Sequence, residues 1–296
     1  MNLKIVKYIK TWIAISLVII IIGFGLIAVR GFNLGVDFIG GSVIYASIGE
    51  DYEIDDIRAL MDEQDLDGTT LRAGQDNKDL VIRLKYEGNQ EEVHDKIIDA
   101  LQDKYNLDAE SVNIDYVGPT MGKELIRNAL TSLLIAGGLI LIYIWIRFEL
   151  VSGVAAIIAL LHDILIMVSI VSIIGVQINS SFIAAILTIV GYSINDTIVV
   201  FDRVRENTKR MGRKISMSEI VDESINDSIT RSINTSLTTL FSIVALYIFG
   251  VESIKDFTLP IIVGIMSGTY SSIFIASPLW AVWTDRGRKT KVAEAK

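Results

Sequence analysis

The sequence predicts a polytopic α-helical membrane protein with six transmembrane helices and an α+β ferredoxin-like domain outside the cytoplasm, between the first helix and the second. Three observations support this fold class. Hydrophobic residues make up 51% of the 296 residues, and apolar runs of spanning length recur along the chain. The charges are unevenly divided: residues 31–125 carry 22 acids and 8 bases, a net charge of −14, whereas the rest of the chain carries a net charge of +6.

The six predicted spans follow from the thickness of a bilayer core, which is about 30 Å and needs about 20 mostly apolar helical residues. The fifth span is the least apolar because it contains several Ser and Thr residues. The predicted spans are residues 13–29, 126–146, 151–174, 181–201, 233–249 and 257–282.

The acidic insert has the alternation and helical spacing of a small α+β domain. Strand-like alternation occurs four times and an apolar helical face occurs twice, in the order βαββαβ, which is that of the ferredoxin-like split βαβ unit. The predicted elements are 42–48 (strand), 53–64 (helix), 69–73 and 79–86 (strands), 91–105 (helix) and 111–117 (strand).

Lys and Arg residues in the short connections predict the orientation. Three lysines lie in the first ten residues, six bases lie between 203 and 214, and four lie between 286 and 291. With an even number of spans these groups share one side, which we expect to be cytoplasmic, so both termini are cytoplasmic. We therefore divide the chain into a cytoplasmic N-terminus with the first helix (1–30), an extracytoplasmic domain (31–125), a five-helix remainder (126–284) and a basic cytoplasmic tail (285–296).

Composition excludes several kinds of chemistry. Without cysteine the chain has no disulfide, thiolate metal site or thiol nucleophile, and its two histidines make a His-based metal site improbable. Residues 118–124 resemble a phosphate loop only faintly, because the glycine spacing is one residue short and Glu124 replaces the Ser or Thr that binds magnesium. We read this segment as a flexible joint and expect no enzyme activity, no cofactor, no metal and no nucleic-acid partner.

Ionisable residues inside spans are the candidate functional residues, since a charge at mid-bilayer costs at least about 2.5–3.5 kcal/mol. Asp163 lies near the middle of the third span, next to His162. Asp196 lies in the fourth span beside Asn195, and Arg231 lies at the start of the fifth. Asp196 and Arg231 could pair across facing helices, and protonation of Asp196 would then release Arg231, as in a proton relay.

Static roles are the alternatives for each of these residues. Arg231 could extend its charge to lipid headgroups, and Asp196 could be a permanent ion-pair partner. His162 and Asp163 are equally compatible with a satisfied histidine in the core.

Several segments together resemble the SecF branch of the SecD/SecF protein-export family, within the resistance-nodulation-division superfamily. The motif GVDFIGG at 35–41 supplies Gly35, Asp37, Phe38, Gly40 and Gly41. The run GYSINDTIVVFDRVREN at 191–207 is the most specific match, and 117–119, 161–163 and 231–236 extend it.

The resemblance implies a subunit that works with a separate SecD chain in the bacterial cytoplasmic membrane. The pair would use the proton-motive force to complete translocation of a preprotein through SecYEG, and Asp196 and Arg231 match positions assigned to proton conduction. Two alternatives stay open: a stand-alone proton-coupled exporter of the same superfamily, and a structural subunit that conducts nothing. The coupling ion, proton or sodium, also stays open.

Overall fold

The computed structural model describes residues 3–64, 66, 68–73, 78–85, 90–107, 111–212 and 215–294. Residue 86, the last of one predicted strand, lies outside the described residues, as do two bases of the predicted cytoplasmic loop (Arg213 and Lys214) and the last two residues of the predicted tail. The described part contains six helices long and apolar enough to cross a membrane and one small antiparallel sheet, which confirms the predicted combination of elements.

The spanning helices are longer than the apolar runs that predict them. They are α1 (Ile9–Arg30), α5 (Pro119–Arg147), α6 (Leu150–Ile174), α7 (Ser180–Met211), α8 (Met217–Phe249) and α9 (Glu252–Ser271) continued by α10 (Ser277–Glu294). A short 3₁₀ turn, Val6–Tyr8, precedes α1.

Local capping explains where three of these helices begin. Pro119 occupies the first position of α5, where its missing N–H costs nothing. Thus residues 118–124 form the start of this helix and not a separate joint. The Asn179 side chain accepts a bond from Phe182 N at the start of α7, and Ser216 accepts one from Glu219 N at the start of α8. Because Ser216 and Glu219 have capping-box spacing, α8 begins sixteen residues before the predicted span.

The sixth span is irregular at two places. Pro260 lies inside α9, where it removes one backbone hydrogen bond. A π-helical turn, Ser272–Ala276, then joins α9 to α10. Such turns are often found at functional positions of membrane and soluble helices, and this one faces α6 and α7 in the centre of the bundle.

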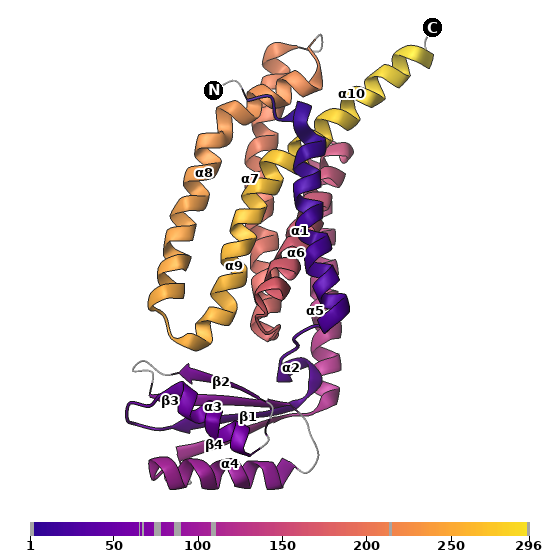
Figure 1. Cartoon of the computed structure of the whole chain (residues 1–296). Coiled ribbons are helices and arrows are strands. Elements are labelled where there is room, and N and C mark those ends of the chain that lie inside the picture. The colour runs from indigo at the N-terminus through magenta and orange to yellow at the C-terminus, as the bar shows by residue number, and fades with distance from the viewer. Residues whose placement is uncertain are drawn as a thin grey trace.

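The bundle is built around α7 and α9 (Figure 1). Small residues allow the close approach: a side-chain carbon added to Gly264 would lie 2.4 Å from Ile189, and one added to Gly268 would lie 2.9 Å from Ser193. By contrast, α5 and α8 lie at the periphery and expose large apolar side chains such as Leu134 and Phe241. These two helices are therefore free to contact lipid or another chain.

The sheet domain follows α1 in the chain and lies at one end of the bundle, whereas both termini lie at the other end (Figure 1). Its strands and helices occur in the predicted order: β1 (Gly41–Ser47), α3 (Ile54–Glu63), β2 (Gly68–Ala73), β3 (Asp79–Lys85), α4 (Gln90–Tyr105) and β4 (Val112–Val117). The strand order is β2-β3-β1-β4, and all neighbours are antiparallel.

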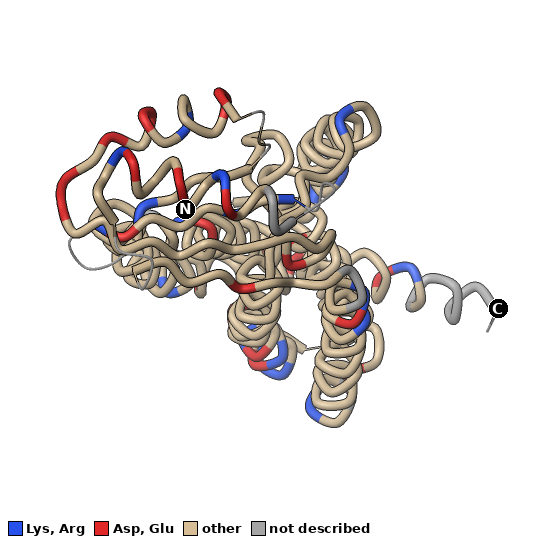
Figure 2. Tube along the Cα trace, turned by 90° about the horizontal axis from the view of Figure 1, so that it is seen from below, with Lys and Arg blue, Asp and Glu red and all other residues tan. Residues whose placement is uncertain are grey.

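Side chains on the two faces of the sheet have different partners. On one face Ile44 and Ile82 lie opposite each other in the register and pack with Ile57 of α3 and Ile97 of α4, all fully buried. On the other face Val43, Leu71 and Val81 pack with Val36 of α2, a four-residue helix (Val36–Ile39) that the sequence did not predict. Viewed from this end of the molecule, acidic residues lie along the helices of the domain (Figure 2).

Candidate functional site

Asp163, in the middle of α6, is the centre of a buried polar cluster. Its side chain is 1% exposed. Ser193 of α7 and Ser271 of α9 donate hydrogen bonds to Oδ2 at 2.6 and 2.8 Å, and Ser267 of α9 donates to Oδ1 at 2.7 Å. Three hydroxyl donors from two other helices thus surround a carboxylate in the core of a membrane bundle.

His162 extends this cluster toward α1. Its Nδ1 lies 3.1 Å from Asp163 Oδ1, and its Nε2 lies 2.7 Å from the hydroxyl of Ser16. The Ser16 hydroxyl also lies 3.3 Å from the carbonyl oxygen of Trp12. A neutral imidazole can donate from Nδ1 to Asp163 and accept at Nε2 from Ser16. His162 therefore links Asp163 to α1.

Asp196 lies on α7, where its side chain is only 4% exposed. Ser232 of α8 and Thr269 of α9 face its carboxyl group. Nevertheless Asp196 Oδ2 and Ser232 Oγ are both buried without a hydrogen-bond partner among the described residues. A buried acceptor without a donor is costly, so this position is less well satisfied than Asp163.

Arg231 and Asn195 lie on the outside of the bundle. Arg231 is exposed on α8, and no ion pair among the described residues joins it to Asp196. It lines a shallow hollow that also contains Asp202, Glu206 and Asp227, of which Asp227 is paired with Arg203 at 2.8 Å. Asn195 is exposed on α7, whereas its neighbour Asp196 is buried. The structure thus places Asp163 and Asp196 inside the bundle and leaves Asn195 and Arg231 facing outward.

The serine donors around Asp163 are the residues that sequence reasoning missed. Ser267 and Ser271 are four residues apart on α9, so they lie on one helical face. This four-residue spacing of two serines is the signal that could have identified them. Ser193, which donates to Asp163, lies three residues before Asp196 on α7, so the two carboxylates are about one helical turn of α7 apart in their contacts.

The double-glycine motif joins the sheet domain to the bundle. Gly40 and Gly41 have φ values of +85° and +154°, and a side-chain carbon on Gly41 would lie 2.0 Å from the carbonyl oxygen of Leu84 in β3. Both positions therefore require glycine. Asp37 accepts hydrogen bonds from the backbone N (2.7 Å) and the hydroxyl of Ser180, the first residue of α7. This acid caps the helix that carries Asp196.

The rest of the motif packs on neighbouring backbone. Gly35 N donates to the carbonyl oxygen of Ile178 at 2.7 Å, and Phe38 is 7% exposed. The carbonyl of Phe38 lies against Gly122 near the start of α5. A second link lies at α9, where Asp256 accepts from Arg83 of β3 at 3.0 Å and from Asn179 at 3.1 Å. The domain is thus fastened to α5, α7 and α9.

A metal centre is not evident at this site. Among the described residues, no group of three or more His, Asp or Glu side chains has the arrangement of a metal site. The oxygen-rich surroundings of Asp163 consist of one carboxylate and three hydroxyls. Such oxygens are ligands for protons and hard monovalent cations and not for soft metals.

Replacing Gly122 with alanine tests the contact between the motif and α5. An added methyl group would lie 2.1 Å from Phe38 O, whereas on Gly137 of the same helix it would meet nothing within 4 Å. We expect Gly122→Ala to lower the free energy of unfolding by about 1–3 kcal/mol, as overpacking does. Gly137→Ala should be neutral or raise it by up to about 1 kcal/mol. Thermal unfolding of the purified chain in detergent checks this; equal effects at the two glycines would contradict it.

Two models of known protein families match this chain. The model for the C-terminal part of the protein export membrane proteins SecD and SecF matches residues 96–286, and the SecD/SecF GG-motif model matches residues 25–47. The chain belongs to the SecD/SecF family. It is 36% identical to the protein translocase subunit SecF of Rickettsia akari, over 99% of this chain and 94% of that protein. It is 38% identical to that of Sebaldella termitidis, over 94% and 91%.

Solved structures agree with this membership. The crystal structure of SecDF, a translocon-associated membrane protein from Thermus thermophilus, superposes with a TM-score of 0.78 at 35% identity and covers 96% of this chain. A SecDF structure in the super-membrane-facing form gives 0.74 at 33% identity over 99% of this chain. This chain spans only 39% and 40% of those longer chains. With its six apolar helices, the chain is a multi-pass membrane protein with a role in protein export.

Proposed function

We propose that this chain is a SecF-type subunit that acts with a separate SecD-type chain and uses a transmembrane ion gradient to drive late steps of protein translocation through SecYEG. The observation that carries the proposal is the pair of carboxylates, Asp163 and Asp196, buried in neighbouring membrane helices at 1% and 4% exposure. Neither forms an ion pair with Lys or Arg among the described residues.

A carboxylate in this position needs a counter-charge. Burial of an ionised carboxylate costs several kcal/mol unless a cation or a set of donors compensates it. Asp163 has three hydroxyl donors, but Asp196 has one oxygen without any donor. Uptake of a proton or a small cation at Asp196 would remove this cost, and its release would restore it. Such a group can therefore respond to an ion gradient.

The outward position of Arg231 supports a second chain. The exposed guanidinium of Arg231 on α8 forms no direct ion pair within the described part of this chain, and a charge at the edge of a bilayer is stabilised by such a partner. The matched SecDF chains are more than twice as long as this chain. We propose that the SecD-type partner covers α8 and supplies a carboxylate to Arg231. The pairing of Asp196 with Arg231 would then form in another step of the cycle.

The sheet domain, which has the ferredoxin-like strand order, is proposed to lie outside the cytoplasm. The basic residues of the connections and tail belong to the opposite end of the bundle, and cytoplasmic connections carry an excess of Lys and Arg. Its place would be the outer face of a bacterial cytoplasmic membrane, where the translocating preprotein emerges. We propose that it holds this preprotein.

The route from ion to movement would run along α7. This helix carries Asp196 in its core, and Asp37 of the domain caps its first residue. A tilt of α7 on protonation of Asp196 would shift that cap and with it the sheet. The link is short and made of hydrogen bonds to backbone, which transmits displacement better than a flexible linker does.

Protein export into vesicles tests the proposed function. Vesicles with SecYEG, the translocation ATPase, this chain and its SecD-type partner are compared with vesicles that lack the two chains. We expect an imposed proton or sodium gradient to accelerate the late phase of export only when both chains are present. Acceleration by this chain alone would favour the stand-alone exporter. No acceleration in an assembled complex would favour the structural subunit.

A crosslink between the domain and the bundle tests whether the domain moves. Arg83 and Asp256 touch across this interface, and the chain has no cysteine of its own, so a cysteine pair at these positions is unambiguous. Joining the pair with a short reducible crosslinker should remove most of the gradient-dependent export, and reduction should restore it. Each single-cysteine variant is the control. Full export with the crosslink in place would contradict domain movement.

A further inference from the structure

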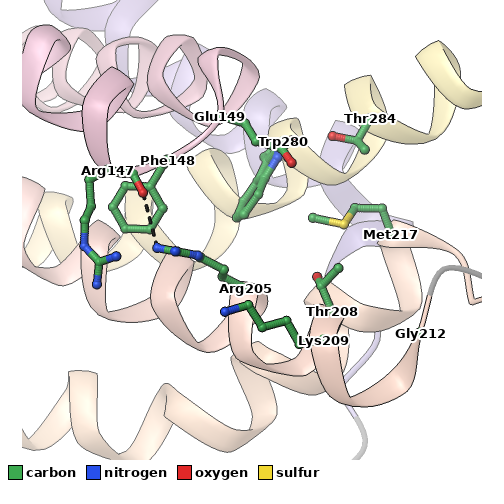
Figure 3. A pocket seen from close by; sticks show the side chains of 10 residues that line it. All are labelled: Arg147, Phe148, Glu149, Arg205, Thr208, Lys209, Gly212, Met217, Trp280 and Thr284. Carbon is green, nitrogen blue, oxygen red and sulfur yellow. Dashed lines mark hydrogen bonds between the residues drawn. The ribbon is translucent and has the colours of Figure 1, made fainter.

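A basic pocket opens at the end of the bundle that is opposite the sheet domain. Five helices meet there, namely the end of α5, the start of α6, the last turns of α7, the start of α8 and the middle of α10. Its volume is about 600 Å³, which is within the range of pockets that hold small ligands. Figure 3 shows the side chains of Arg205, Lys209 and Trp280 around it.

The pocket contains hydrogen-bonding groups that the protein leaves unused. Trp280 is 4% exposed and its Nε1 has no partner, and the buried hydroxyl of Thr284 has none either among the described residues. Trp280 is held in place by Phe201, whose ring centroid lies 4.8 Å away. A buried indole N–H without an acceptor is costly and uncommon in a native protein. Because Trp280 lines the pocket, a ligand there is the candidate acceptor for this donor.

The charges of the pocket favour an anion. Arg205 and Lys209 form no ion pair with a carboxylate among the described residues, and Arg205 donates only to the carbonyl oxygen of Arg147 at 3.3 Å (Figure 3). Arg147 is already paired with Asp202 at 3.5 Å. Glu149 is the one acid among the lining residues. Two unpaired cations and a neutral donor suit a phosphate group, which accepts several charge-assisted bonds at once.

The surroundings of the pocket select a lipid as the source of this phosphate. Next to its rim, Ile146 is 80% exposed and Leu150 is 59% exposed, so apolar surface continues from the pocket along α5 and α6. Basic pockets between membrane helices bind anionic headgroups in this way. We propose that the pocket binds the headgroup phosphate of an anionic phospholipid, whose acyl chains lie along α5 and α6. The bound lipid then connects the ends of α5 and α7 with the middle of α10.

Native mass spectrometry of the full-length chain in neutral detergent tests the proposal, with phosphatidylglycerol and phosphatidylcholine as probes. Phosphatidylglycerol should bind more tightly than phosphatidylcholine. Arg205→Gln with Lys209→Gln should weaken it about tenfold or more, since each lost bond involves a charged group. Trp280→Phe should weaken it several-fold without changing the charge. An unchanged thermal unfolding temperature and a single peak in size-exclusion chromatography confirm that a variant is folded.

The matched control removes two positive charges from the same end of the bundle but outside the pocket. Lys10 is exposed on α1, and Arg210 pairs with Glu223 at 2.6 Å. Lys10→Gln with Arg210→Gln should leave phosphatidylglycerol binding unchanged. An equal loss in this control would overturn the proposal in favour of diffuse attraction. Displacement of the lipid by millimolar inorganic phosphate would also overturn it, because the site would then serve a soluble anion. If Trp280→Phe does not fold, the comparison between Arg205→Gln with Lys209→Gln and the control pair decides.

Discussion

Replacing Asp196 with asparagine is expected to abolish the gradient-dependent part of protein export and to leave the ATP-dependent part intact. Asparagine has nearly the shape of aspartate, so packing between α7, α8 and α9 should survive. It cannot bind and release a proton at neutral pH, nor can it neutralise a cation. Initial rates of export into vesicles, with and without an imposed gradient, measure both parts in one preparation.

Asp202 provides the matched control for this variant. It lies on the same helix six residues further on, but its side chain is 47% exposed and contacts only Arg147 among the described ion pairs. Asp202→Asn removes the same charge without touching the bundle core, and exposed pairs of this kind contribute about 0–1 kcal/mol. We expect it to keep the full gradient response. If Asp196→Asn also keeps it, the relay role of Asp196 is wrong.

Replacing Asp163 with alanine is expected to give the largest loss of stability in the chain. The change removes the acceptor of Ser193, Ser267 and Ser271. Each hydroxyl that finds no other acceptor costs about 1–3 kcal/mol, and the vacated volume adds a cavity. Ser271 already lies 3.2 Å from the carbonyl oxygen of Gly268, so part of the loss is recovered. Thermal unfolding of the chain in detergent measures the remainder.

Asparagine at position 163 separates the structural role of this residue from an ionic one. The amide oxygen still accepts from one or two serines, and the amide nitrogen can donate to a rotated hydroxyl. We expect Asp163→Asn to retain most of the thermal stability and to lose the gradient response. Full stability together with full gradient-driven export would identify Asp163 as a purely structural acceptor, which is the static role left open by the sequence.

Much of the fold is readable in the sequence because its signals are local and strong. Six apolar runs and the acidic insert identify the helices and the sheet, since contact with lipid requires apolar residues and contact with water favours charged ones. The helix ends are less readable. The start of α8 depends on Ser216 and Glu219, and nothing in the apolar pattern marks the π-helical turn at Ser272–Ala276, which packs against α6 and α7.

The site was predictable only as a set of unusual residues. A carboxylate inside a span is visible in the sequence, so Asp163 and Asp196 could be named. Which donors meet them depends on how helices far apart in the chain face each other, so Ser267 and Ser271 could not be assigned to Asp163. The same holds for Arg231, because its position in the sequence does not show that it lies on the outward face of α8. The proposed contact between Arg231 and a partner chain cannot be read from one sequence either.

Ion flux through the assembled complex tests the central claim most directly, because it does not depend on export itself. The complex of this chain with its SecD-type partner is reconstituted in liposomes that contain a pH-sensitive or sodium-sensitive dye, and a gradient is imposed. The account predicts a flux of one of the two ions that requires both chains, is lost in Asp196→Asn and persists in Asp202→Asn. An undiminished flux in Asp196→Asn, or no flux of either ion in a complex that supports gradient-driven export, would contradict it.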